Sequence, residues 1–234
     1  MWQILGSVAP RELAAARIQL HWAAQVVSAA ADAYLAPVAD DSHTAMAWQG
    51  GALVGKAGVS LYVADFALAV GNDRVALDGK TLDDAMAWAD ARLGKRGMHA
   101  RDYDMPVEPE RFTRLADELA ELARYYANAA ELFAAYAACS VWPHHFDLGG
   151  TIKLAGTAEI GVGLSPGDHA YAEPYLYVTP YPLKLGATLP PLVSGGHWST
   201  AFTGAVMTNL VLAGEAGARA FVESAIGASR SVIA

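Results

Sequence analysis

The chain has few charged residues, one cysteine and no strongly basic segment. Of its 234 residues, 17% are charged and 54% are hydrophobic, which suits a large packed core and excludes a disordered chain. The formal net charge of −8 disfavours nucleic acid and anionic membranes as partners, because both attract surfaces rich in Lys and Arg. Lys95 and Arg96 form the only adjacent basic pair.

Other absences concern the cellular compartment. A single cysteine, Cys139, cannot form an intrachain disulfide, which fits a reducing compartment, and we expect a cytoplasmic protein. The N-terminal residues lack the basic stretch and long apolar run of a secretory signal. The apolar stretch 201–213 is too short to cross a bilayer, so no membrane span is expected.

Several motifs of common enzyme classes are also missing. The sequence has no Walker-type phosphate loop, no Gly-x-Gly-x-x-Gly, no Gly-x-Ser-x-Gly and no His-Glu-x-x-His. These absences disfavour nucleotide kinases, dinucleotide oxidoreductases, ordinary α/β-hydrolases and zincin proteases. Cys139 falls at the apolar end of a predicted helix, so we interpret it as a core residue and not as a nucleophile.

Apolar residues at helical spacing predict two helices in the first half. The first begins at Pro10 and ends before Pro37, and its polar stripe is either solvated or the wall of a ligand site; the stripe contains Arg17, His21, Gln25 and Ser28. Thr81 and Asp84 form an approximate capping box, which predicts the start of a helix that ends at Gly94.

A third helix is the most clearly patterned in the chain. Apolar residues repeat every three or four positions from Pro109 to about Cys139, which is typical of a long central helix, and Pro143 closes it. One or two Ala-rich helices are expected to finish the chain.

Strand patterns occur in two regions. Short apolar runs separated by glycines between 43 and 77 predict an antiparallel meander, and further strands are expected over 151–154, 159–164 and 175–178. A long loop rich in Pro and Gly covers 180–196. Because helices and strands occur in blocks, we expect a single α+β domain, residues 1–234. Its antiparallel sheet, built from both β regions, would pack against the long central helix and the N-terminal helix, with Ala-rich C-terminal helices.

The segment Trp142-Pro143-His144-His145-Phe146-Asp147 is rich in groups that carry chemistry. In an extended chain His145 and Asp147 share one face while His144 points away. A His-x-Asp pair suits half of a metal site, or a base with its orienting carboxylate. The alternative is a polar cap on the carbonyl groups at the end of the preceding helix.

A second group follows Ser165-Pro166-Gly167-Asp168, which predicts a β-turn. The turn does not require the polar residues that end or follow it, which are Asp168, His169 and Glu173. Tyr175 and Tyr177 share a strand face and would form an aromatic wall with two hydroxyl groups.

Two shorter segments complete the set. In Gly195-Gly196-His197-Trp198 the paired glycines allow a close backbone approach, and the imidazole of His197 lies beside the apolar ring of Trp198. The alternative is a loop fixed by a buried tryptophan. The segment Asp40-Asp41-Ser42-His43-Thr44 is either part of a site or a solvated loop.

Taken in order, these blocks resemble a bacterial family known only as a domain of unknown function. The resemblance extends from about Glu12 to Val206 and rests on His21-Trp22 with Gln25, Asp41-Ser42-His43-Thr44 with Trp48, Trp142-Pro143-His144-His145-Phe146-Asp147, Gly163-Leu164-Ser165-Pro166-Gly167-Asp168, Glu173-Pro174-Tyr175-Leu176-Tyr177 and Gly196-His197-Trp198. It implies that the blocks belong together, and it supplies no activity, cofactor or substrate. After Trp198 the pattern leads us to expect a further histidine and an acidic residue, where Ser199 and Ala201 stand.

Three functional hypotheses follow. The first is an enzyme acting on a small molecule, with His145, Asp147 and His197 as catalytic groups; these three together with His169 would also be the ligands of a divalent metal cofactor. The second is a non-catalytic module that binds a small molecule in the same cavity. The third is a structural protein whose C-terminal helices pack against another copy in a homo-oligomer. The expected binding residues are His21, Gln25, His43, Trp142, His144, Ser165, Asp168, Glu173, Tyr175, Tyr177 and Trp198.

Overall fold

A computed structural model describes residues 1–233 of the chain and has the predicted α+β fold, with helices and antiparallel sheets. The chain divides into two compact units, and both are discontinuous in sequence. Unit 1 consists of residues 1–6, 124–139 and 147–234, and unit 2 consists of residues 7–123 and 140–146. The expected single domain stays a prediction, which this division does not test.

The predicted meander between residues 43 and 77 is confirmed in unit 2. Five antiparallel strands pair in sequence order: β1 (Ala47–Gln49), β2 (Ala52–Val54), β3 (Val59–Tyr62), β4 (Ala67–Val70) and β5 (Asp73–Ala76). Glycines supply the tight turns, for example Gly71 with a φ of 57° between β4 and β5, a conformation that costs glycine little. A short strand, β6 (Ser140–Val141), forms an isolated antiparallel bridge between Val141 and Met46.

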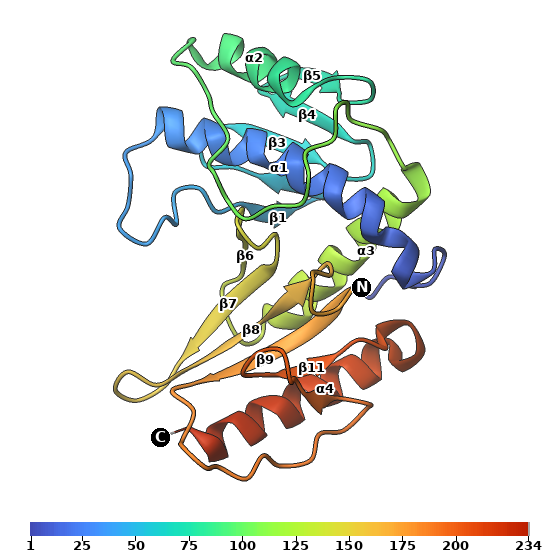
Figure 1. The fold of residues 1–234 in the computed structure, drawn as a ribbon, viewed down its shortest axis with the longest axis vertical. Helices are drawn as coiled ribbons and strands as arrows, with labels where there is room; N and C mark the ends of the chain where they lie inside the picture. The colour runs from blue at the N-terminus through green and yellow to red at the C-terminus, as the bar shows by residue number, and fades with distance from the viewer. Residues whose placement is uncertain (234) are drawn as a thin grey trace. The chain divides into compact units, whose positions relative to one another are not determined.

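Two helices pack on this sheet, and both were predicted. The 3-10 helix η1 (Pro10–Leu13) leads into α1 (Ala14–Tyr34), which contacts β2 and β3, while α2 (Leu82–Leu93) contacts α1 and β4 (Figure 1). The middle of α1 is Ala-rich and almost wholly buried, because small side chains let a helix approach a sheet closely. Thr81 and Asp84 form the expected capping box at the start of α2.

The prediction of a central helix from Pro109 to Cys139 is wrong at both ends, since α3 covers only Ala116–Phe133. The helix begins later than predicted because the backbone of Phe112 is bonded elsewhere. Its N–H donates to the Lys80 carbonyl, and its carbonyl accepts from the Gly79 N–H. Those contacts fix Phe112 in a loop, although its side chain follows the helical spacing. Beyond Phe133 the chain turns, and Cys139 lies outside the helix.

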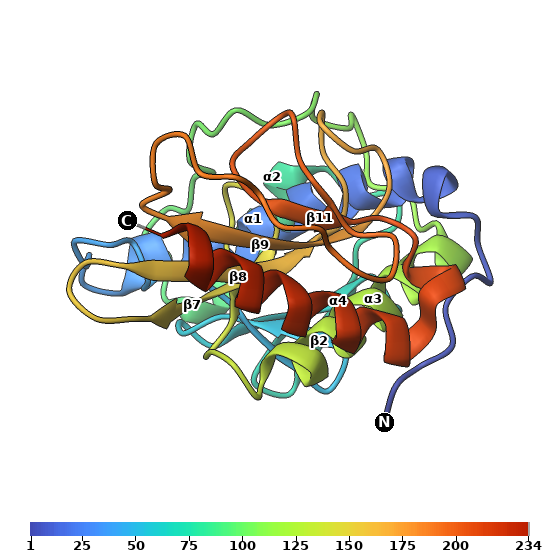
Figure 2. The same cartoon turned by 90° about the horizontal axis from the view of Figure 1, so that it is seen from below.

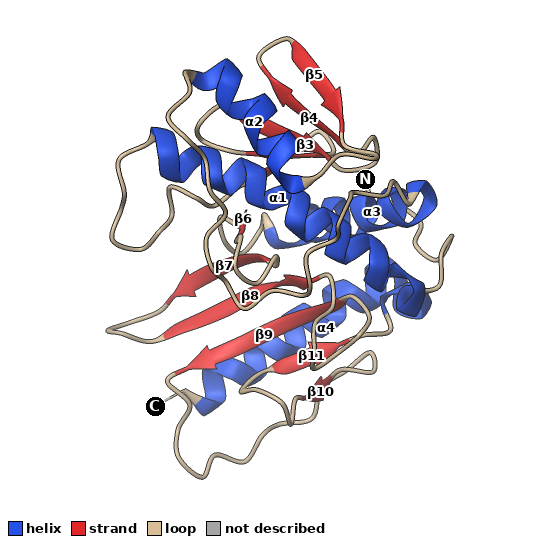
Figure 3. Ribbon diagram, turned by 45° about the horizontal axis from the view of Figure 1, so that its top comes forward, coloured by secondary structure: helices blue, strands red, loops and turns tan. Residues whose placement is uncertain are grey.

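Unit 1 contains a second antiparallel sheet with the order β10-β11-β9-β8-β7 (Figure 3). Its strands are β7 (Leu148–Lys153), β8 (Glu159–Ser165), β9 (Tyr175–Tyr181), β10 (His197–Trp198) and β11 (Ala205–Met207). The strands predicted at 159–164 and 175–178 fall within β8 and β9, and the one predicted at 151–154 overlaps β7, which begins three residues earlier and ends at Lys153. The two β regions thus build separate sheets, and the expected single sheet built from both regions is wrong, because the strands of each region pair only with one another. The long loop expected after residue 180 runs from β9 to β10.

A single C-terminal helix, α4 (Leu210–Val232), covers one face of this sheet and contacts β9 and β11 (Figure 2). Gly214 interrupts its helical geometry with φ 59° and ψ −166°, so the expected one or two C-terminal helices are one helix with a kink near its start. Apolar residues of β8 and β9 form the buried face, namely Ile160, Val162, Leu164, Leu176 and Val178. Among residues 1–233, no helix combines the length and the apolar character needed to cross a bilayer.

The capping box of α2 gives a direct test of local stability. Thr81 Oγ1 accepts from the Asp84 N–H at 3.0 Å, and the Asp84 carboxylate accepts from the Thr81 N–H at 3.1 Å. We expect Thr81→Ala to lower the free energy of unfolding by about 1 kcal/mol, measured by urea denaturation. Thr81→Ser keeps the hydroxyl and should lose much less; equal losses in both variants would contradict the capping role.

Candidate functional site

A row of small and polar residues crosses one face of the unit 1 sheet. Gly149 on β7 is paired with Gly163 on β8, and Gly163 is paired with Tyr177 on β9. The row continues through Val206 on β11 to His197 on β10. Directly opposed residues on neighbouring strands point to the same face. The pairing therefore brings together parts of three sequence blocks that are far apart in the chain.

The two glycines make room for the ring of Tyr177. A Cβ atom at Gly163 would overlap the Tyr177 hydroxyl and the Leu148 carbonyl oxygen, and one at Gly149 would overlap the same hydroxyl. The Tyr177 ring lies across them, and its hydroxyl donates a hydrogen bond to the Asp147 carboxylate. Burial, followed by the negative charge of Asp147, raises the pKa of Tyr177 well above its usual 10. The phenol therefore stays protonated and remains a donor.

A second tyrosine–carboxylate pair lies on the same face. The Tyr175 hydroxyl donates to Asp168 at 2.6 Å, and burial, then this bond, raises the pKa of Tyr175. The other Asp168 oxygen accepts from the backbone N–H groups of Ala170 and Tyr171 at 2.8 and 3.0 Å. Asp168 is thus held in place by three donors. Ser165 Oγ accepts from the N–H of Gly167 at 3.2 Å. The N–H of Asp168 donates to the Tyr171 carbonyl, so it does not close the predicted β-turn on Ser165.

Tyr171 connects these pairs to His197. Its ring centre lies 5.0 Å from that of Tyr175 and 5.9 Å from that of His197. Its hydroxyl lies 3.3 Å from His197 Nε2 and donates to Ser199 Oγ at 3.1 Å. We call this set, Asp147, Asp168, Tyr171, Tyr175, Tyr177 and His197, the tyrosine–carboxylate cluster. Sequence reasoning missed Tyr171, although its place between Asp168 and Glu173 was a usable signal.

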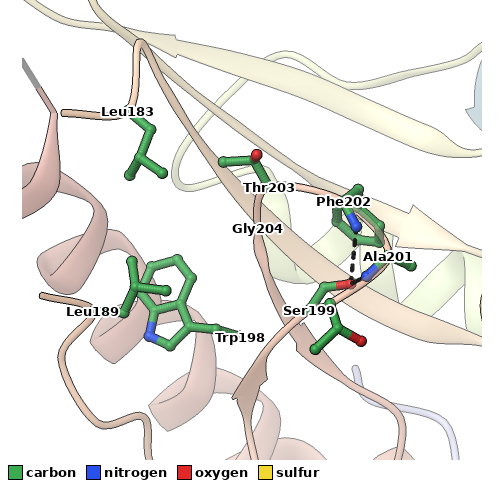
Figure 4. Close-up of a pocket in the computed structure, with 9 residues that line it drawn as sticks. Leu183, Leu189, Trp198, Ser199, Ala201, Phe202, Thr203 and Gly204 are labelled. Carbon is green, nitrogen blue, oxygen red and sulfur yellow. Dashed lines mark hydrogen bonds between the residues drawn. The ribbon is translucent and has the colours of Figure 1, made fainter. Parts of the chain in front are cut away.

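A cavity of about 330 Å³ adjoins the cluster within unit 1 (Figure 4). Phe202 belongs to both, because it lines the cavity and its ring centre lies 6.3 Å from that of Tyr175 and 6.4 Å from that of Tyr171. Ser199 also belongs to both, and its Oγ accepts from the N–H groups of Ala201 and Phe202 at 3.1 and 3.3 Å. The lining residues are Leu183, Leu189, Trp198, Ser199, Thr200, Ala201, Phe202, Thr203 and Gly204.

Trp198 was a predicted binding residue, and it lines the cavity with a fixed orientation. Its indole N–H donates to the Pro190 carbonyl at 2.7 Å. The remaining lining residues were missed, because leucines, threonines and alanine carry no distinctive signal in a sequence. Ser199 and Ala201, where the resemblance leads us to expect a histidine and an acidic residue, both line the cavity.

Cys139 lies near the cluster in unit 1 and is half-buried. Burial, then the charge of Asp147, raises the pKa of its thiol to about 11. Such a thiol carries little thiolate at neutral pH, which argues against a nucleophilic role. The raised pKa thus supports the interpretation that Cys139 is not a nucleophile, but the residue is half-buried and lies outside the helix, so it is not the helical core residue that was expected.

In unit 2, His21 and Gln25 hold the main chain of the Trp142–Phe146 segment. The Pro143 carbonyl lies 2.8 Å from His21 Nε2 and accepts from Gln25 Nε2 at 2.9 Å. The His21 ring stacks on Phe146 with ring centres 4.8 Å apart. Both polar side chains are buried, so this part of the stripe is not solvated. Their assignment as binding residues stays a prediction.

His144 and His145 are exposed at the surface of unit 2. Their ring centres lie 4.3 Å apart, and His144 also contacts the rings of Trp142 and Tyr103 at 6.1 and 6.0 Å. The helix α3 ends well before this segment and β6 intervenes. The capping alternative assumed that the segment directly follows a helix, and the structure shows that it does not.

His43 is buried in a network of charged groups. Its Nε2 lies 3.0 Å from Asp32, and its Nδ1 accepts from the Val38 N–H at 3.4 Å. Arg101 pairs with Asp32 and also with Asp41, at 3.1 Å. This network ties two loops to α1. Both ring nitrogens of His43 are occupied, so its role is structural.

The proposed metal ligands do not gather. Within the described part of the chain, no three His, Cys, Asp or Glu side chains are arranged to hold a metal ion. His169 and His197 are exposed and Glu173 is partly buried, and His145 belongs to unit 2. The assignment of His145, Asp147, His169 and His197 to a divalent metal finds no grouping that supports it.

Compared with protein-family models, curated proteins and solved structures, the chain shows no significant match. The resemblance to an uncharacterised bacterial family therefore stays a prediction, and the site has to be interpreted from its geometry.

The close packing of Gly163 against Tyr177 predicts that one added methyl group lowers stability strongly. Gly163→Ala would push against the Tyr177 ring and the rigid Leu148 carbonyl, and we expect it to lower the free energy of unfolding by about 3 kcal/mol, measured by urea denaturation. Gly227, exposed on α4, has open space around its Cβ position. Gly227→Ala is the matched control and should raise stability by up to about 1 kcal/mol. A neutral Gly163→Ala would refute the packing.

His21 predicts a loss of stability in mild acid. Burial, with smaller contributions from Arg17, His144 and His145, lowers its pKa from 6.5 to about 4, opposed by its bond to Pro143. Between these values the unfolded chain binds a proton that the folded chain does not. The free energy of unfolding should therefore fall as the pH drops through this window, by at most about 3 kcal/mol. Urea midpoints between neutral pH and pH 4 measure it.

His21→Gln should flatten this dependence, because Gln does not titrate. Exposed His99 provides the control, and His99→Gln should leave the slope unchanged. An unaltered slope in His21→Gln would show that other groups cause the acid sensitivity.

Proposed function

We propose that unit 1 binds a small molecule in the cavity beside the tyrosine–carboxylate cluster. The observation that carries the proposal is the shared wall. Phe202 and Ser199 line the cavity of about 330 Å³ and also contact Tyr171 of the cluster. Ligand sites are typically concave and mostly apolar, with a few placed polar groups, and this combination is met here.

The walls suit a ligand with an apolar body. Leu183, Leu189 and Trp198 stand on one side of the cavity, and the turn of residues 199–204 stands on the other (Figure 4). The hydroxyl groups of Thr200 and Thr203 are the polar groups available for orientation. A binding module is therefore the function that we favour, and a cytoplasmic location and a homo-oligomeric state remain part of the proposal.

Acid–base catalysis on the bound molecule is the second candidate. It is favoured by the contacts from exposed His197 through the Tyr171 hydroxyl to Ser199 at the cavity wall, because such a chain can pass a proton between solvent and a ligand. Catalysis would appear as a chemical change in the ligand that Tyr171→Phe abolishes while binding persists. Unchanged turnover in Tyr171→Phe would refute this role.

A cavity-filling substitution tests the binding site. Thr203 is exposed and lines the cavity, so Thr203→Trp should occupy the space and reduce the affinity for a small probe such as naphthol by at least about tenfold. Ligand-observed NMR titration of the full chain measures the affinity.

Thr157→Trp is the matched control, since Thr157 is exposed in the turn between β7 and β8 and does not line the cavity. It should bind naphthol as the wild type does. The proposal fails if the wild type shows no saturable binding, or if Thr203→Trp binds equally well.

A further inference from the structure

Charge is almost absent from the segment of unit 1 that lines the cavity. None of the nine lining residues is charged. Between residues 181 and 214, Lys184 is the only Lys, Arg, Asp or Glu. A charged ligand would leave water without gaining a partner of opposite sign in the wall, and that desolvation is costly.

Asp168 of the cluster is already engaged by donors of the protein. Asp168 accepts from the Tyr175 hydroxyl and from two backbone N–H groups. The imidazole of His197 faces Tyr171 and does not line the cavity. These groups therefore offer an ion in the cavity little compensation, and the selection should be for uncharged molecules.

Trp198 offers the ligand its ring face. Because its indole N–H is donated to the Pro190 carbonyl at 2.7 Å, the group left for a ligand is the flat π surface. The bond also fixes the ring, so stacking on it costs little ordering of the side chain. Phe202 adds a second aromatic ring to the wall. Flat aromatic rings gain from stacking or edge contacts with such residues beyond the area that they bury.

The approach to the cavity is apolar as well. Five of the ten large hydrophobic side chains exposed on the described chain lie at the end of β9 and on the loop that follows it, namely Tyr181, Leu183, Leu185, Leu189 and Val193. Leu183 and Leu189 also line the cavity. Exposed apolar groups mark sites of interaction when they gather, and Lys184 is the only charged residue of this segment.

We infer that the cavity selects uncharged, planar aromatic molecules about the size of one or two fused rings. The inference rests on the proposed function and names its ligand class. The volume of about 330 Å³ lies at the small end of the range for ligand pockets. Such a ligand lies against Trp198, and any hydroxyl group it carries can bond to the threonines of the turn.

Four probes of the same bicyclic skeleton test this on the full chain at neutral pH. They are naphthol, which is neutral and flat; decahydronaphthol, which is neutral and puckered; naphthoate, an anion; and naphthylmethylammonium, a cation. We expect naphthol to bind saturably, and the other three to bind at least about tenfold more weakly, by NMR titration. Trp198→Leu should reduce the affinity for naphthol by a similar factor, whereas Trp88→Leu in unit 2 should leave that affinity unchanged.

The outcomes separate the two proposals. If no probe binds, or if Thr203→Trp leaves the binding unchanged, the proposed function fails. If Thr203→Trp blocks binding but an ion binds as tightly as naphthol, the site stands and the selection for neutral molecules is wrong. If decahydronaphthol matches naphthol, or if Trp198→Leu has no effect, the selection for flat rings is wrong.

Discussion

The organisation of unit 1 depends on the hydrogen bond from Tyr177 to Asp147. For the phenol to reach that carboxylate, its ring must lie across β8, and this is sterically allowed only because glycine occupies two paired positions, Gly149 and Gly163. Each glycine in a strand costs roughly 0.5–1 kcal/mol. A hydrogen bond to a charged group contributes about 1.5–3 kcal/mol, so one such bond offsets much of that cost while it fixes the ring.

Once Tyr177 is fixed, strand periodicity determines much of the rest. Tyr175 falls on the same face two residues earlier and bonds to Asp168, and His197 reaches this face through the pairing of β9, β11 and β10. The opposite face is apolar and covered by α4. Adjacent residues on a strand point to opposite faces, so His197 contributes to the cluster while its neighbour Trp198 contributes to the cavity. A two-residue strand thereby links both parts of the site.

How much the sequence predicts depends on whether a residue's partner is local. The capping box joins residues three apart, and the meander is formed by neighbours in sequence, so both follow from local patterns. Phe112 has helical spacing, yet its backbone N–H bonds to the carbonyl of Lys80. The spacing of apolar residues does not predict such a long-range bond. His21 and His43 were selected by residue type alone. Whether an imidazole holds a ligand or a carbonyl, as His21 holds that of Pro143, is decided only by tertiary structure.

The same distinction explains why the carboxylates identified in the sequence are poor guides to the ligand. Asp147 and Asp168 are the acidic groups of the cluster. Asp147 accepts from the Tyr177 phenol, and Asp168 accepts from the Tyr175 phenol and from backbone N–H groups. Their charge is used to position aromatic rings. The surface left for an outside molecule is then the uncharged wall of Trp198, Phe202 and the turn between β10 and β11. The carboxylates and phenols that stand out in the sequence thus hold the site together, and the uncharged residues of the wall face the ligand.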